Sequence, residues 1–238
     1  MRLLEWNVAH QTRRKTIPAM AGMALANLEP DVVVLTEYVA DKSHGDFLGV
    51  LKAAGLAQIE PSGYVAGQNQ VLIASRSEWE VDDSNPPDHS SATTPNWRHL
   101  RLATPGFDLI GLRVPMFRSA AVRSAYWDWL ENAVLAMRDR PTVLIGDLNA
   151  DPGRAHRVGG GHLTRLADQG WCLATPDAGW SFVGKTGRTS RIDHAILSPH
   201  FRLDSKPQYV PEWNGFKFAG PEAYSDHAVL CVDISKTG

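Results

Sequence analysis

Acidic, amide and histidine side chains recur at the points where apolar runs of this sequence begin or end. Gly146-Asp147-Leu148-Asn149 follows the run 142–145, Ser190-Arg191-Ile192-Asp193-His194 overlaps the run 192–197, and Ser225-Asp226-His227 precedes the run 228–234. Near the N-terminus, Asn7 and Glu37 each close a similar run. Oxygen ligands with one imidazole suit a divalent cation and a phosphate ester. The five junctions therefore predict one polar site built at strand ends.

The apolar spacing predicts helices and strands that alternate in the first half, with mainly paired strands in the second. Helices are expected at about 16–28, 44–55, 119–138 and 161–169. Strands are expected at about 2–7, 31–36, 63–66, 70–75, 79–82, 97–103, 107–114, 142–146, 180–183, 191–197, 202–209 and 228–234. The segment 83–96 is rich in turn residues and predicts an exposed loop. The pattern indicates an α/β protein with mixed sheets and outer helices, in which ligands bind beyond the strand ends.

The longest predicted helix, 119–138, carries apolar residues at helical spacing, which we expect to face the core. They are Ala121, Val122, Ala125, Trp129, Ala133, Val134 and Met137.

Length and composition bound the class of protein. The 238 residues, 43% of them hydrophobic, fit one domain spanning 1–238, although two small domains are also compatible. The absence of an 18-residue apolar run and of a signal peptide predicts a cytoplasmic protein with no membrane partner. Two cysteines cannot form a disulfide framework. The net charge of −2 argues against non-specific coating of duplex nucleic acid, although a local basic strip remains compatible.

Each polar junction has a structural alternative when it is taken alone. Asn7 suits a turn, Glu37 a surface carboxylate, and Asp147 with Asn149 an Asx-turn. Asp193 is compatible with an edge-strand charge paired with Arg191, and the Asp226-His227 segment with a plain loop. Order and placement together favour function over these alternatives.

The polar junctions occur in an order that is typical of one known superfamily. In chain order they are Trp6-Asn7, Thr36-Glu37, Gly146-Asp147-Leu148-Asn149, Arg191-Ile192-Asp193 and Ser225-Asp226-His227. From Arg2 to Ile234 the chain resembles the endonuclease/exonuclease/phosphatase superfamily, which includes deoxyribonuclease I. The resemblance implies a four-layered α/β sandwich, two central mixed β-sheets flanked by helices, with a metal site at one rim.

The resemblance also implies roles for individual residues. Glu37 would be the principal ligand of Mg²⁺ or Mn²⁺, with Asn7 and Asp226 beside it. Asp147, held by Asn149, would deprotonate the attacking water. His227 would contact the scissile phosphate, and Asp193 would fix its tautomer and support its positive charge.

Arg113 departs from the family pattern because it stands where a histidine is usual. An arginine keeps its proton near neutral pH, so it cannot act as a general acid. It remains suited to clamp a phosphate oxygen or stabilise the leaving alkoxide. The structural alternative is a rim arginine paired with a carboxylate.

Basic residues follow the predicted catalytic strands and would form a rim that suits a polyanion. The candidates for substrate binding are Arg13, Arg14, Arg118, Arg154 and Arg157, with Lys185, Arg188 and Arg191 near them in the second half. Ordinary solvated loop charge is the alternative. Trp213, Phe216 and Phe218 precede Ser225, where the abasic-site endonucleases of the family form a sugar pocket. Stacking on bases or a sugar and packing in the core are both compatible with these rings.

The sequence thus predicts a Mg²⁺- or Mn²⁺-dependent phosphodiesterase, a monomeric nuclease that hydrolyses nucleic acid, DNA in preference to RNA, by water attack in one step. Two alternatives stay open. One is a hydrolase of a small phosphate ester or phospholipid head group, and the other is a non-catalytic member that binds nucleic acid or protein.

Overall fold

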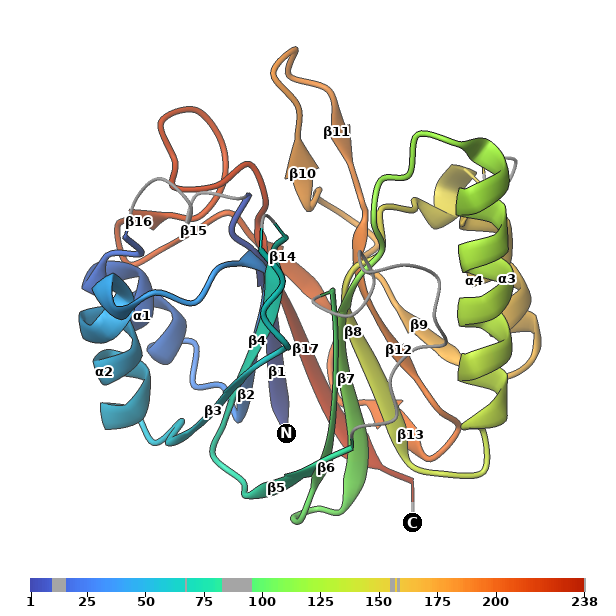
Figure 1. The fold of residues 1–238 in the computed structure, drawn as a ribbon, viewed down its shortest axis with the longest axis horizontal. Helices are drawn as coiled ribbons and strands as arrows, with labels where there is room; N and C mark the ends of the chain where they lie inside the picture. Colours follow the sequence, from blue (N-terminus) through green and yellow to red (C-terminus); the bar gives the residue numbers. More distant parts are fainter. Residues whose placement is uncertain (10–15, 67, 83–95, 155–156, 158, 238) are drawn as a thin grey trace.

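Two β-sheets lie face to face, and helices cover the outer face of each (Figure 1). The computed structural model describes residues 1–9, 16–66, 68–82, 96–154, 157 and 159–237. The order of layers is helix, sheet, sheet, helix, which is the four-layered α/β sandwich predicted from the sequence.

The first sheet has seven strands within the described residues, in the order β13-β17-β1-β2-β4-β3, with β14 also paired to β17. Only β1 and β2 run parallel among these pairs. The strands are β1 (Arg2–Asn7), β2 (Val32–Tyr38), β3 (Gln58–Pro61), β4 (Gln70–Ser75), β13 (Phe201–Leu203), β14 (Gln208–Val210) and β17 (Val229–Lys236).

The second sheet has six strands within the same residues, in the order β5-β6-β7-β8-β12-β9. Its parallel pair is β7 with β8. The strands are β5 (Trp79–Val81), β6 (Trp97–Leu102), β7 (Phe107–Arg113), β8 (Thr142–Asp147), β9 (Cys172–Ala174) and β12 (Asp193–Leu197).

Helices α1 (Ala19–Ala26) and α2 (Gly45–Ala53) cover the first sheet, and α3 (Ala120–Ala136) and α4 (Gly160–Asp168) cover the second (Figure 1). The 3₁₀ helix Lys42–His44 leads directly into α2, and the 3₁₀ helix Pro152–Arg154 lies between β8 and α4. The hairpin of β10 (Phe182–Val183) and β11 (Thr189–Ser190) projects above the sheets, and β15 (Glu212–Trp213) pairs with β16 (Phe216–Lys217).

The core has three layers of buried apolar side chains. One lies between α1, α2 and the first sheet, around Trp6 and Phe47. The second fills the space between the sheets, around Leu3 and Ile73, and the third lies between the second sheet and α3 with α4, around Trp127. Among the described residues, no helix has the length and apolarity that a bilayer crossing requires.

Both parallel pairs bring polar residues to one end of the sandwich. Asn7 lies opposite Thr36 in the register of β1 and β2, one residue before Glu37. Arg113 lies opposite Asp147 in β7 and β8, and Asp193 pairs with Asp147 from the other side. Because parallel strands end at the same sheet edge, these side chains converge.

Three sequence predictions about elements need correction. The strand expected at 63–66 lies instead at β3, and the strand expected at 202–209 is two short strands, β13 and β14, on the same edge of β17. On α3 the buried side chains include Tyr126, Trp127 and Leu130, whereas Ala121, Val122 and Ala125 are exposed. The loop predicted at 83–96 lies almost wholly outside the described residues.

Candidate active site

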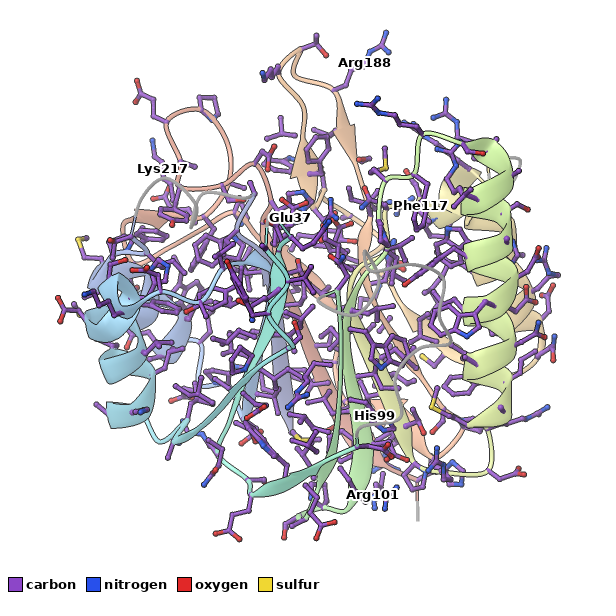
Figure 2. All side chains as sticks on the ribbon, in the orientation of Figure 1. Glu37, His99, Arg101, Phe117, Arg188 and Lys217 are labelled. Carbon is purple, nitrogen blue, oxygen red and sulfur yellow. The ribbon has the colours of Figure 1, made fainter. Side chains whose placement is uncertain are left out.

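A cleft of about 440 Å³ opens where the polar strand ends meet. Six of the residues predicted to be catalytic or metal-binding line it: Glu37, Arg113, Asp147, Asn149, Asp226 and His227. Asn7 and Asp193 are fully buried and contact this group from below, Asn7 through Asp147 and Asp193 through His227. Figure 2 shows Glu37 near the upper end of the sandwich, between its two halves.

Glu37 reaches the cleft because β2 is irregular at this point. The register of β2 against β4 shifts between Leu35 and Tyr38, and Glu37 itself has a φ of 57°. A bulge of this kind redirects a side chain, and a positive φ in a non-glycine residue persists only where surrounding structure imposes it. The Glu37 side chain is buried, and its Oε1 lies 2.6 Å from Arg113 Nη2.

Oxygen donors beside Glu37 fit a divalent cation. Asp226 is half-buried, and its Oδ1 accepts no hydrogen bond within the described residues. Burial raises the pKa of Asp226, an effect that the nearby His227 opposes. Asn7 donates its amide NH₂ to Asp147 Oδ2 at 2.9 Å, while its oxygen accepts from the Ala9 N–H at 2.7 Å. The amide oxygen retains a second lone pair, so carboxylate and amide oxygens of the type Mg²⁺ and Mn²⁺ prefer are present.

Asp147 is held by several donors at the end of β8. The backbone N–H of Asn149 donates to Asp147 Oδ1 at 2.9 Å, which closes the Asx-turn considered as the structural alternative. The Asn149 side chain donates to Asp147 Oδ2 at 3.2 Å and to the Val114 carbonyl at 2.8 Å. Burial, followed by the negative charge of Asp193, raises the Asp147 pKa to about 7, although His227 and Arg113 oppose this. A carboxyl group with such a pKa suits proton transfer near neutrality.

His227 and Asp193 form a buried pair. His227 Nδ1 lies 2.9 Å from Asp193 Oδ2, and His227 Nε2 lies 3.8 Å from Asp226 Oδ1. Burial alone would lower the His227 pKa, but attraction and hydrogen bonding to Asp193, with the further attraction of Asp147 and Asp226, outweigh it and raise the pKa to about 9. The raised pKa favours the cationic form of His227 at neutral pH. Asp193 does not pair with Arg191, which donates to the carbonyls of Pro176 and Asp177.

Three features of the site were missed in the sequence. Glu5 is fully buried beneath the cleft and accepts from Thr36 Oγ1 at 2.9 Å. Burial and the neighbouring charges of Asp193 and Asp147 raise its pKa well above the usual range. A lone charge inside the run Leu3-Leu4-Glu5-Trp6 was the available signal. Phe182, whose ring centroid lies 5.1 Å from that of His227, and Met116 also line the cleft, and nothing in their sequence context marked them.

The residues predicted to bind substrate are dispersed. Arg154 and Arg157 line the cleft, and Arg118 is exposed on the segment before α3. Arg13 and Arg14 lie outside the described residues. Trp213 is 40% exposed on β15 and does not line the cleft.

Phe216 packs against core aromatic rings. Its ring centroid lies 6.2 Å from that of Trp6 and 5.1 Å from that of the fully buried Phe218. This arrangement favours core packing over stacking on substrate for Phe216 and Phe218.

A second group of possible ligands, Asp82, His99 and Asp108, lies at the opposite end of the second sheet (Figure 2). Asp108 precedes Arg113 by five residues along β7, roughly 17 Å at strand spacing. Asp108 lies 3.0 Å from His99 Nε2, 3.5 Å from Arg101 and 3.4 Å from Arg140. These basic partners balance the acidic charge, so an ion-pair network accounts for this group without a bound metal ion.

The sequence matches the pattern of one known protein family over most of its length. The sequence pattern of the Endonuclease/Exonuclease/phosphatase family matches residues 4–227. No curated protein matches the sequence.

Several solved structures share the fold. An AP endonuclease from Archaeoglobus fulgidus superposes with a TM-score of 0.69 at 18% identity, covering 98% of both chains. Truncated TDP2 from Caenorhabditis elegans gives 0.69 at 17% identity, covering 99% of this chain and 97% of that one. The 3'-5' exonuclease NExo from Neisseria meningitidis gives 0.67 at 19% identity, covering 98% and 99%.

Proposed function

Because the chain belongs to the endonuclease/exonuclease/phosphatase family of phosphate-ester hydrolases, we propose that it is a Mg²⁺- or Mn²⁺-dependent phosphodiesterase that hydrolyses DNA. The observation that carries this proposal is the convergence, in one cleft, of Glu37, Asp226, Asp147 and the His227–Asp193 pair. These groups come from both sheets, so their meeting requires the complete sandwich.

The side chains divide the chemistry between a base and a cationic clamp. Asp147 takes the proton of the attacking water, since its pKa lies near neutrality and Asn149 fixes its orientation. His227, charged because of Asp193, binds the scissile phosphate and stabilises its developing negative charge. Asp193 is a positioning residue because it contacts the histidine and not the cleft.

Glu37 and Asp226, with Asn7 below them, would hold the divalent cation. The cation would neutralise phosphate charge and help to stabilise the leaving oxygen. Asp226 Oδ1 supports this assignment because it is a buried carboxylate oxygen that accepts no hydrogen bond from the described residues.

Exposed basic residues around the cleft support a nucleic-acid substrate. Arg154 and Arg157 line the cleft, while Lys185 and Arg188 are exposed in the turn between β10 and β11. Figure 2 shows Arg188 at the upper end of the molecule. Cations in this arrangement suit the successive phosphates of a strand. Similar folds include an AP endonuclease and a 3' phosphatase bound to a DNA hairpin, which favours DNA over RNA.

The volume of the cleft favours a second candidate function, hydrolysis of a small phosphate ester. About 440 Å³ lies within the range of small-molecule sites. Hydrolysis of a small ester would require the metal and His227, but not the exposed basic residues around the cleft.

Cleavage assays under varied salt separate these candidates. Purified protein with Mn²⁺ should cut plasmid, single-stranded or abasic duplex DNA, and its apparent DNA affinity should fall steeply as salt rises. The double variant Arg154→Ala/Arg157→Ala should reduce the salt slope by about one unit for each lost phosphate contact. Hydrolysis of bis-p-nitrophenyl phosphate should change little in the same variant, because this diester is too small to span the rim.

The matched control is Arg202→Ala, which removes an exposed arginine on β13. It should leave the salt slope unchanged. An unchanged slope in the double variant, or cleavage of the small ester without cleavage of any DNA, would favour the second candidate. Binding of DNA without hydrolysis of any ester would favour a non-catalytic member of the family.

A further inference from the structure

The positively charged guanidinium of Arg113 lies against the carboxylate of Glu37, the residue proposed as the principal metal ligand. Its Nη2 lies 2.6 Å from Glu37 Oε1, and its Nε lies 3.8 Å from Asp147 Oδ2. The Arg113 side chain is only 14% exposed, and its buried Nε has no hydrogen-bond partner within the described residues. The ion pair is thus largely shielded from solvent, and part of the guanidinium's donor capacity is unused.

The fold fixes the backbone of Arg113 and leaves the side chain as its movable part. Arg113 is the last residue of β7, paired in register with Asp147 of β8. The next residue, Val114, donates its N–H to the Asp147 carbonyl at 2.8 Å and accepts from Asn149 at 2.8 Å. The side chain therefore reaches from the second sheet to Glu37 on the first, and it can change partner by rotation alone.

A guanidinium and a dication repel each other strongly at such short range. Like charges a few ångströms apart in a shielded site cost several times what they cost in water. Glu37 therefore cannot bind a divalent cation at full strength while it also holds Arg113. A guanidinium displaced from Glu37 keeps its fork of donors, which matches two phosphate oxygens.

We propose that Arg113 is a competing cation of this site, which occupies Glu37 until a divalent cation displaces it toward the substrate phosphate. The inference rests on the proposed metal site. It couples the two ligands, because metal binding releases Arg113 for the phosphate, and phosphate binding draws Arg113 away from Glu37. Such coupling is reciprocal, so each ligand would tighten the binding of the other.

Calorimetric titration with Mn²⁺ tests the competition directly. The variant Arg113→Gln should bind Mn²⁺ at least about tenfold more tightly than the wild type, because the repelling charge is gone. Arg113→Lys keeps a cation and should stay nearer the wild-type affinity. Arg154→Gln is the matched control. It removes an arginine that lines the same cleft but pairs with Asp151, so the affinity should stay within about threefold of wild type.

A second measurement uses the wild-type protein and so does not depend on the folding of a variant. The Nε–H resonance of Arg113, identified by its loss in Arg113→Lys, should shift on saturation with Mg²⁺, while that of Arg202 should not.

Mn²⁺ binding by the wild type with equal or weaker binding by Arg113→Gln would overturn the inference and leave the metal site intact. An unmoved Arg113 resonance at Mg²⁺ saturation would do the same. Absence of any Mn²⁺ binding by the wild type would instead overturn the proposed metal site itself.

Discussion

At the scale of single residues, the charge on His227 depends on Asp193. Burial disfavours the imidazolium, and the Asp193 carboxylate 2.9 Å from Nδ1, together with the charges of Asp147 and Asp226, more than offsets this. Burial lowers the pKa of His227 but raises the pKa of Asp147, because in both residues it disfavours the charged form. The charged form of Asp147 is the one that can accept a proton. One buried cleft therefore holds a cationic histidine and a carboxylate that titrates near neutrality.

We predict a bell-shaped pH dependence for hydrolysis of bis-p-nitrophenyl phosphate. The rate should rise through about pH 7 as Asp147 loses its proton and fall above about pH 9 as His227 loses its own. The divalent cation would favour the charged form of Asp147, so the acid limb should move to lower pH at saturating metal.

Asp193→Asn should move the alkaline limb toward lower pH by about one to three pH units, because the charge that raises the His227 pKa is removed. The maximal rate should fall less than in His227→Ala, where a loss of about 10²–10⁴-fold or more is expected. Asp177→Asn, which alters an exposed carboxylate, is the control and should leave both limbs in place. An alkaline limb that stays near pH 9 in Asp193→Asn would contradict the role of this pair.

The sequence predicted these residues because each lay near the beginning or the end of an apolar run, a pattern visible without coordinates. The sequence did not reveal that Arg113 would contact Glu37. The two residues lie far apart in the chain and on different sheets, so their contact depends on how the sheets pack and on the bulge that redirects Glu37.

At the scale of elements, two parallel strand pairs determine which side chains meet. Each pair is joined through a helix, α1 for β1 and β2 and α3 for β7 and β8. The close approach of β7 to β8 also restricts position 146. A Cβ atom on Gly146 would lie 1.7 Å from the Leu112 carbonyl oxygen, so any side chain would push apart the strands that carry Arg113 and Asp147.

Gly146→Ala should therefore destabilise the protein by about 1–3 kcal/mol or more, as overpacking of a tight site does. Its activity should fall as well, because Asp147 follows directly. Gly49→Ala is the matched control, since a Cβ there meets nothing within 4 Å and Gly49 lies inside α2. It should raise stability by up to about 1 kcal/mol. Urea denaturation measures both changes, and a neutral Gly146→Ala would disprove the proposed restriction.

The buried face of α3 and the extent of the strand expected at 202–209 were less predictable than the polar residues of the site. On α3, small and large apolar residues counted equally in the sequence pattern. Burying Tyr126 and Trp127 removes far more apolar area from water than burying Ala121 or Ala125, so the large rings set the rotation of the helix. The strand expected at 202–209 splits after Asp204, whose backbone N–H still donates to the Asp233 carbonyl of β17. The ladder resumes only at Gln208 opposite Cys231, so residues 205–207 are extra chain that bulges away from the edge of β17.

At the scale of the whole molecule, whose net charge is −2, two groups of acidic side chains lie far apart. The proposed active site lies at one end of the sandwich, and the group of Asp82, His99 and Asp108 lies at the other (Figure 2). The two groups differ in how their carboxylates are balanced. Arg101 and Arg140 pair with Asp108 of the second group, whereas Asp226 Oδ1 in the first group accepts no hydrogen bond from the part of the chain that the structure describes. We therefore propose that the functional cation binds at the Glu37 end.

Metal-dependent hydrolysis by two matched variants tests this assignment most directly. The rate on bis-p-nitrophenyl phosphate is measured against Mn²⁺ concentration for the wild type, Glu37→Gln and Asp82→Asn, with chelator as the zero point. We predict that chelator abolishes wild-type turnover, that Glu37→Gln removes most of it and weakens the Mn²⁺ dependence, and that Asp82→Asn behaves as the wild type. Full Mn²⁺-dependent turnover in Glu37→Gln, or its loss in Asp82→Asn alone, would contradict the account.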